Sequence, residues 1–299
     1  MCGIVGLFLK KPELEAELGA WLAPMLTAMG ERGPDSAGFA VYRPPAAGCT
    51  VKVTLHHPDE GYPWQQLWDD LALTLGARVE GEVRASHCVL MSDAPEEALR
   101  RALALRHREV HLMGIGETIE IYKEKGRPED VAERFGLAGF RGSHAIGHTR
   151  MATESAVTTE HSHPFSTGLD LCLVHNGSLS NHNRLRLSLK RHGIVFQTDN
   201  DSEVAAGYLT WRLRQGASLD EALASALDDL DGFYTFAVGT RDGFAVLRDR
   251  FACKPAVLAE TDEWVAMASE YRSIAHLPGA EDAQIWEPAP ATVYSWARH

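Results

Sequence analysis

The chain has 299 residues and carries 41 acidic against 29 basic side chains, which gives a formal net charge of −12. This acidic balance argues against nucleic acid as the main partner, because binding to phosphates needs clustered Lys and Arg. No apolar run approaches the roughly 18–20 residues that span a bilayer, and the apolar stretch 4–9 is too short for the core of a signal peptide. We therefore expect a cytoplasmic, globular protein without a membrane segment.

Apolar spacing along the chain predicts an alternation of strands and helices. Strands are predicted over 3–9, 39–42, 83–91, 115–122, 145–147, 171–174, 234–238, 244–247 and 264–268, and helices over 13–29, 64–75, 95–105, 202–214 and 219–230. We expect residues 51–140 to form a semi-independent unit with strands and helices of its own. Groups of strands with helices placed between them are typical of an α+β or layered α/β protein.

The sequence lacks the usual motifs for phosphate loops, dinucleotides and nucleophile elbows. The pairs His56-His57 and His161-Ser-His163 have no thiol or carboxylate at helical spacing beside them, so loop histidines are favoured over metal ligands. The five cysteines are scattered without a C-x-x-C pair, which argues against a disulfide framework and a structural zinc site. We expect no metal in this chain.

Cys2 is the candidate nucleophile. Removal of Met1 would leave a thiol and a basic amine on the same first residue. An α-amine has an ordinary pKa of about 8, so part of it is unprotonated at neutral pH and can accept the thiol proton directly or through one water. This is the solution of N-terminal nucleophile enzymes, in which the base is not a histidine.

Four further segments bear on the role of this cysteine. They are Arg32-Gly-Pro-Asp-Ser-Ala-Gly38, His148-Thr-Arg-Met-Ala-Thr153, His175-Asn-Gly177 and Asp199-Asn-Asp-Ser-Glu-Val204. Through these four segments and the start Met1-Cys2-Gly3-Ile4-Val5-Gly6, the sequence resembles class II glutamine amidotransferases. These are N-terminal nucleophile hydrolases that remove the amide of glutamine. The resemblance is nearest to stand-alone amidotransferase subunits of glutamate-synthase-like enzymes, N-methylglutamate synthase in particular.

This resemblance implies a fold and a set of roles. The fold is an α+β four-layer αββα sandwich of two antiparallel sheets over residues 1–299, with an inserted α/β unit at about 51–140. Cys2 would attack the side-chain carbonyl of glutamine and form a glutamyl thioester. Asn176 and Gly177 match the positions that donate to the oxyanion. On its own, Asn-Gly is also typical of a type I′ hairpin turn.

Recognition of glutamine also requires its α-carboxylate and α-ammonium to be bound. Arg150 matches the carboxylate ligand, since its planar guanidinium can make a bidentate pair. Asp201 matches the ammonium ligand, with Asp199 as a competitor two residues away. The alternatives are a surface ion pair for the arginine and a helix N-cap for Asp201. Arg32 and Asp35 would support the nucleophile from a neighbouring loop.

The sequence contains no segment that would accept the released nitrogen. The resemblance therefore implies other subunits of a glutamate-synthase-like complex, with FMN and an iron–sulfur cluster in a partner and no cofactor in this chain. Glutamine or glutamate would be the small-molecule substrate, and the unit at 51–140 would contribute to the partner interface. Two alternatives stay open: an N-terminal nucleophile amidase with another substrate, and a catalytically silent structural or regulatory subunit.

Overall fold

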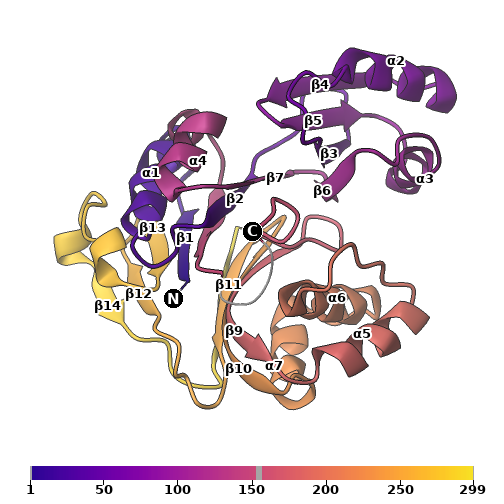
Figure 1. The fold of residues 1–299 in the computed structure, drawn as a ribbon. Coiled ribbons are helices and arrows are strands. Elements are labelled where there is room, and N and C mark those ends of the chain that lie inside the picture. Colours follow the sequence, from indigo (N-terminus) through magenta and orange to yellow (C-terminus); the bar gives the residue numbers. More distant parts are fainter. Residues whose placement is uncertain (1, 153–156, 299) are drawn as a thin grey trace.

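The computed structural model describes residues 2–152 and 157–298. Figure 1 shows two stacked β-sheets with helices on their outer faces, and a smaller α/β unit beside them. All pairs of neighbouring strands are antiparallel. This arrangement places the start of the chain in the middle of the molecule.

The larger sheet has seven strands. Their order is β14 (Gln284–Trp286), β12 (Val257–Glu260), β13 (Trp264–Ala268), β1 (Gly3–Leu9), β8 (His144–Arg150), β2 (Ser36–Tyr42) and β7 (Ile119–Lys125). The central strand β1 is buried on both faces, so it is apolar throughout instead of alternating. Val5 and Leu7 face the outer helices, whereas Ile4 and Phe8 face the second sheet.

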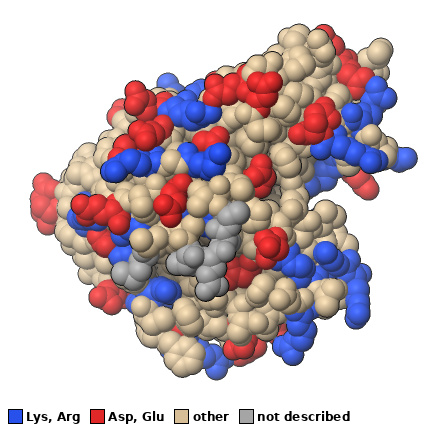
Figure 2. All heavy atoms as spheres, in the orientation of Figure 1, with Lys and Arg blue, Asp and Glu red and all other residues tan. Residues whose placement is uncertain are grey.

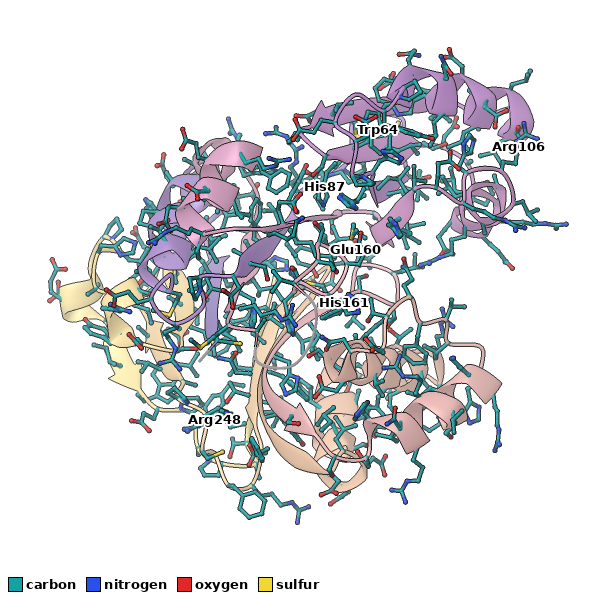
Figure 3. All side chains as sticks on the ribbon, in the orientation of Figure 1. Trp64, His87, Arg106, Glu160, His161 and Arg248 are labelled. Atoms are coloured by element: carbon teal, nitrogen blue, oxygen red, sulfur yellow. The ribbon has the colours of Figure 1, made fainter. Side chains whose placement is uncertain are left out.

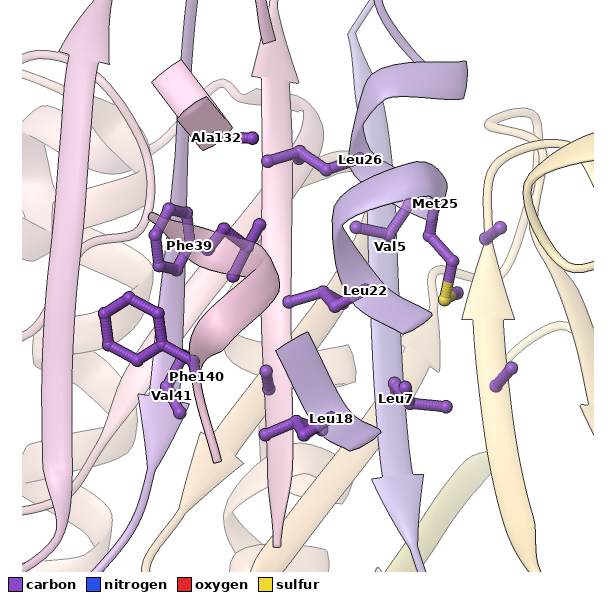
Figure 4. Packing of buried hydrophobic residues seen from close by; sticks show 14 of the residues in the cluster. Val5, Leu7, Leu18, Leu22, Met25, Leu26, Phe39, Val41, Ala132 and Phe140 are labelled. Atoms are coloured by element: carbon purple, nitrogen blue, oxygen red, sulfur yellow. The ribbon is translucent and has the colours of Figure 1, made fainter. Parts of the chain in front are cut away.

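Two helices cover the outer face of this sheet, α1 (Leu18–Ala28) and α4 (Pro128–Phe135). Figure 4 shows α1 over the sheet, and its Leu18, Leu22 and Leu26 belong to the same apolar cluster as Val5 and Leu7 of β1. The helix predicted over 13–29 is therefore present, but its first turn, Pro12–Glu17, is a 3₁₀ helix.

The second sheet has four strands, in the order β15 (Val293–Ala297), β11 (Gly243–Arg248), β10 (Gly232–Thr240) and β9 (Cys172–Leu179). Its outer face is covered by α6 (Asp201–Arg214) and α7 (Leu219–Asp229), and α5 (His182–Arg191) packs against α6. Apolar side chains from both sheets, including Ile146, Val174 and Phe244, fill the space between them. The predicted αββα sandwich is confirmed.

The inserted unit is a separate four-stranded sheet with two helices. The strand order is β4 (Val79–Arg84), β5 (His87–Ser92), β3 (Val51–His56) and β6 (His111–Gly116), with α2 (Trp64–Leu75) and α3 (Glu96–Arg106) packed on the sheet. Its extent differs from the expected 51–140, because β7 and α4 belong to the sandwich. Tyr42 of β2 pairs with Ile119 of β7, so the chain leaves the sandwich and returns to it at one position.

Two predicted strands each turn out to be a pair of strands. The stretch 83–91 contains the end of β4 and the start of β5, and 115–122 contains the end of β6 and the start of β7. The second turn is organised by the carboxylate of Asp170, which accepts hydrogen bonds from the backbone N–H groups of Glu117, Thr118 and Ile119 at 2.8–3.0 Å. A distant residue therefore shapes this turn.

A buried ion cluster also joins the inserted unit to the sandwich. Glu120 of β7 accepts hydrogen bonds from Lys52 Nζ of β3 at 2.5 Å and from Arg43 Nε at 2.6 Å. Tyr122 donates to the other carboxylate oxygen at 3.0 Å. The Glu120 pKa is lowered although burial opposes this, because Lys52 and Arg43 stabilise the charged form.

Candidate active site at the amino terminus

Cys2 lies half-buried just before β1, close to the end of the neighbouring strand β8. Its Sγ atom accepts a hydrogen bond from Met151 N–H at 3.5 Å. Its carbonyl oxygen accepts from Arg32 Nε at 2.9 Å and from Asn176 Nδ2 at 3.1 Å. The candidate nucleophile is thus held by three separate segments of the chain. Met1, whose removal is expected, lies outside the described residues.

The loop before β2 supports this position from one side. Arg32 also pairs with Glu270, with Nη1 and Oε1 2.6 Å apart, and this contact lowers the pKa of Glu270. Asp35 connects to the segment after β8: its N–H donates to the Arg150 carbonyl at 3.1 Å, and its Oδ2 accepts from Ala152 N–H at 2.8 Å. Arg32 therefore contacts Cys2 itself, and Asp35 contacts the segment whose Met151 N–H donates to the cysteine sulfur.

Asn176 and Gly177 lie within β9, paired with Thr235 and Tyr234 of β10. The alternative of a hairpin turn is wrong, because the strand continues through both residues to Leu179. Gly177 has a φ of +145°, and a Cβ atom there would lie 2.0 Å from the Phe233 carbonyl oxygen. Only glycine fits this position.

The side chain of Asn176 has a fixed orientation. Its Nδ2 donates to Cys2 and, at 3.3 Å, to Ser269 Oγ. Its Oδ1 lies 3.1 Å from His148 Nε2, which must be the donor because a carbonyl oxygen only accepts. Burial lowers the pKa of His148 to about 3, so the ring is neutral at physiological pH.

Two further histidines surround this contact. The His148 and His163 rings lie 4.0 Å apart between centroids. His163 Nε2 and His175 Nδ1 each lie 2.9 Å from Ser202 Oγ at the start of α6. All three rings are buried, and burial lowers the pKa of each. The sequence motifs contained these histidines, but nothing in them indicated the shared serine or Ser269.

Asp201 is the first residue of α6, and the N-cap that was its alternative role belongs to Asn200, whose side chain accepts from Ser202 N–H. Asp201 Oδ2 accepts from Leu179 N–H at 2.9 Å, and its Oδ1 lies 3.9 Å from His175 Nδ1. Its side chain is 23% exposed. The competitor Asp199 is 91% exposed and pairs with His161.

Arg150 ends β8 and is buried, next to the residue that contacts the sulfur of Cys2. The side chain therefore does not lie on the surface, where the alternative role placed it. Thr153, the last residue of its motif, lies outside the described residues. In the described part of the chain, no three His, Cys, Asp or Glu side chains form a group that could hold a metal ion.

An αββα sandwich of two antiparallel sheets is the fold of N-terminal nucleophile hydrolases, and in this chain Cys2 directly precedes the central strand of the larger sheet. The solved structure of glutamine phosphoribosylpyrophosphate amidotransferase from B. subtilis has this fold. Its similarity covers 99% of this chain and 49% of that chain, with a TM-score of 0.59 and 19% identity. The chain thus spans about half the length of that structure.

Sequence comparisons narrow the class to a family. Residues 148–276 match a family model described as a glutamine amidotransferase domain. The chain is 55% identical to the glutamine amidotransferase-like protein GlxB of Rhizobium meliloti, over 99% of this chain and 98% of that protein. It is also 31% identical to a putative glutamine amidotransferase of Methanothermobacter thermautotrophicus, over 98% of this chain and 99% of that protein. The chain belongs to the class II glutamine amidotransferase family.

The structure also bears on the expected absence of a membrane segment. Among the residues it describes, none of the helices is both long and apolar enough to cross a bilayer.

Proposed function

We propose that this chain is the glutamine-hydrolysing subunit of a larger enzyme. The observation that carries the proposal is the pair of hydrogen bonds by which Arg32 Nε and Asn176 Nδ2 hold the carbonyl of Cys2. They bring an amide donor of fixed orientation beside a sulfur-bearing residue at the start of the chain. This is the donor type that acyl transfer needs at the developing oxyanion.

In the proposed reaction, the Cys2 amine takes the thiol proton as Sγ attacks the side-chain carbonyl carbon of glutamine. Asn176 and the Gly177 N–H stabilise the oxyanion, and Arg150 and Asp201 bind the α-carboxylate and α-ammonium. The C–N bond then breaks, and ammonia leaves with the proton from the amine. Water adds to the thioester, which releases glutamate and restores the thiol.

The finer assignment follows the resemblance of the sequence. We propose that the ammonia passes to another subunit of a glutamate-synthase-like complex, N-methylglutamate synthase in particular. In this proposal the partner carries FMN and an iron–sulfur cluster, this chain carries no cofactor, and the complex is cytoplasmic. The similarity to the glutamine amidotransferase-like protein GlxB supports only the amidotransferase part of the proposal.

Glutamate release and covalent labelling by a diazoketone analogue of glutamine test the proposal together. We expect Cys2→Ala to lose both, while Cys253→Ala, which changes an exposed free cysteine, retains both. The intact mass of the active protein should equal that of the chain without Met1.

Two results would favour the alternatives. A folded wild-type protein that neither turns over glutamine nor takes the label is a silent subunit. Equal turnover of short acyl amides and glutamine indicates an amidase with another substrate, because a head-group clamp would then have no role.

A further inference from the structure

A cleft of about 600 Å³ lies between the inserted unit and the sandwich. One wall comes from α3, the segment after it and β6, and the other from residues 166–167, residues 193–197 and the end of α6. Figure 2 shows a notch at this edge, with Lys and Arg on both sides of it. The two walls meet where Gln197 Nε2 donates to the Leu112 carbonyl at 2.8 Å.

The cleft combines apolar and cationic side chains. Leu103, Val110 and Val195 contribute apolar surface, and Val195 is 78% exposed. Arg108 and Arg214 contribute positive charge from opposite walls. None of the described lining residues is Asp or Glu, although acidic residues outnumber basic ones by 41 to 29 in the whole chain. The charged side chains among the described lining residues are therefore positive, opposite in sign to the net charge of the protein.

The cationic surface continues beyond the cleft. Lys190 and Arg191, in the last turn of α5, are exposed and precede the lining residue Gly193 by a few positions. Within the described part of the chain, neither residue makes an ion pair, and neither does Arg214. A small anion would occupy only the cleft, whereas an extended acidic segment can use this whole surface.

Two segments of the second wall are connected to the candidate active site. Ser166 follows His163 by three residues, and His163 contacts Ser202. On the same wall, Gln197 N–H donates to Glu203 Oε1 at 2.8 Å, in the first turn of the helix that begins with Asp201. An occupant of the cleft therefore touches two segments that hold the site.

We propose that this cleft docks an acidic segment of a partner polypeptide, with an apolar side chain between the walls and carboxylates against Arg108 and Arg214. Apolar burial supplies affinity, and the arginines supply orientation and selectivity. The docking itself does not depend on the proposed function. Only its consequence for glutamine hydrolysis rests on that proposal.

The probe is a fluorescein-labelled twelve-residue peptide of Glu with two Leu, measured by fluorescence anisotropy with the full-length protein. We expect saturable binding that Arg108→Glu/Arg214→Glu weakens at least tenfold. The matched control Arg101→Glu/Arg141→Glu makes the same change in net charge at exposed residues outside the cleft lining, and should alter binding less than twofold. Replacing Leu by Ser in the peptide should also weaken binding.

Three results would overturn the proposal. The first is that the peptide does not bind the protein saturably, or that it binds the cleft variant and the control variant equally well. The second is full displacement of the peptide by inorganic phosphate at equal concentration, which indicates a simple anion site. The third is self-association in sedimentation that only the cleft variant abolishes, which makes the occupant a second copy of this chain. Since the readout is binding, failure here is distinct from failure of glutamine turnover.

Discussion

The amide of Asn176 has two chemically different ends, and each end has its own partner. Nδ2 faces Cys2, and Oδ1 faces the ring N–H of His148. Rotation of the amide by 180° would bring its Oδ1 against the Cys2 carbonyl oxygen, which places two acceptors together. The Cys2 carbonyl therefore selects the orientation of the amide, and the ring N–H of His148 binds the other end and holds it there.

This role predicts a particular pattern for variants of His148. His148→Leu should lower kcat about 10–100-fold with little change in KM, since the loss of a whole oxyanion donor costs about 10²–10³. His148→Gln retains an N–H donor and should recover most of the rate. Steady-state kinetics on glutamine check this, and a rise in KM without loss of kcat would contradict the positioning role.

For Arg150 we predict an effect on KM and not on kcat. Arg150→Lys should raise KM for glutamine about 10–100-fold, because a charge-assisted hydrogen bond contributes about 1.5–3 kcal/mol. Arg191→Lys, an exposed change of the same type, is the control. An unchanged KM would show that the carboxylate of glutamine binds elsewhere.

For individual residues, the sequence was informative where the residue belongs to a recognised motif. The motifs identified Cys2, Arg32 and Asn176, which the structure joins by hydrogen bonds. Ser269 could not be predicted, because it reaches Asn176 from a position 93 residues away and stands in no recognised motif. Long-range partners of this kind become visible only once strands pair.

Among the elements, the segment between β8 and β9 depends on a buried lysine. Lys123 of β7 donates from Nζ to the carbonyl oxygens of Glu160, Ser162 and Pro164 at 3.1, 2.8 and 3.3 Å. Burial lowers the pKa of Lys123 to about 8. Figure 3 shows Glu160 and His161 between the inserted unit and the sandwich. One ammonium group thus anchors the segment that leads into His163.

Removal of this ammonium should loosen the segment. Lys123→Met leaves three carbonyl groups without their donor, and we expect a loss of at least about 2 kcal/mol in the free energy of unfolding. Hydrogen exchange of the backbone N–H groups of residues 160–163 should also become faster. Lys125→Met, an exposed lysine on the same strand, should cost less than about 0.5 kcal/mol. Equal effects of both variants, by urea unfolding, would contradict this role.

Local patterns predicted element types better than element ends. Trp64–Leu75 is a helix over the same residues as predicted, because its apolar positions repeat clearly. The turn at Glu117 was missed, since the residue that organises it, Asp170, lies 53 positions later. Asn176-Gly177 has the composition of a turn, yet pairing with β10 keeps it in a strand.

For the whole molecule, several buried histidines make stability depend on pH. Burial lowers the pKa of His56 to about 4 and those of His144 and His148 to about 3. In the unfolded chain these rings have their ordinary pKa near 6.5 and take up protons first. The free energy of unfolding should therefore fall as the pH drops below about 6.5.

Urea unfolding at pH 7.5 and 5.5 measures this effect. Three such histidines together should lower the free energy of unfolding by up to about 4 kcal/mol between these pH values. His144→Gln should reduce the difference by about a third, whereas His192→Gln, which changes an exposed histidine, should not. A pH-independent free energy of unfolding would show that other groups compensate.

The division of the chain was harder to predict than its layers. Composition changes little between β6 and β7, so nothing marks the point near residue 118 where the chain re-enters the larger sheet. The layers themselves follow from the apolar strands and the helices between them.

The pairing of Tyr42 with Ile119 makes the inserted unit a removable module. A short turn can link these two positions, since antiparallel neighbours need only about two connecting residues. Such a truncated protein would lose Lys52 and Arg43, the two cations that pair with Glu120. Engineering of a minimal version therefore has to change Glu120 or give it a new partner at the same time, and the same junction offers a place to insert a foreign domain.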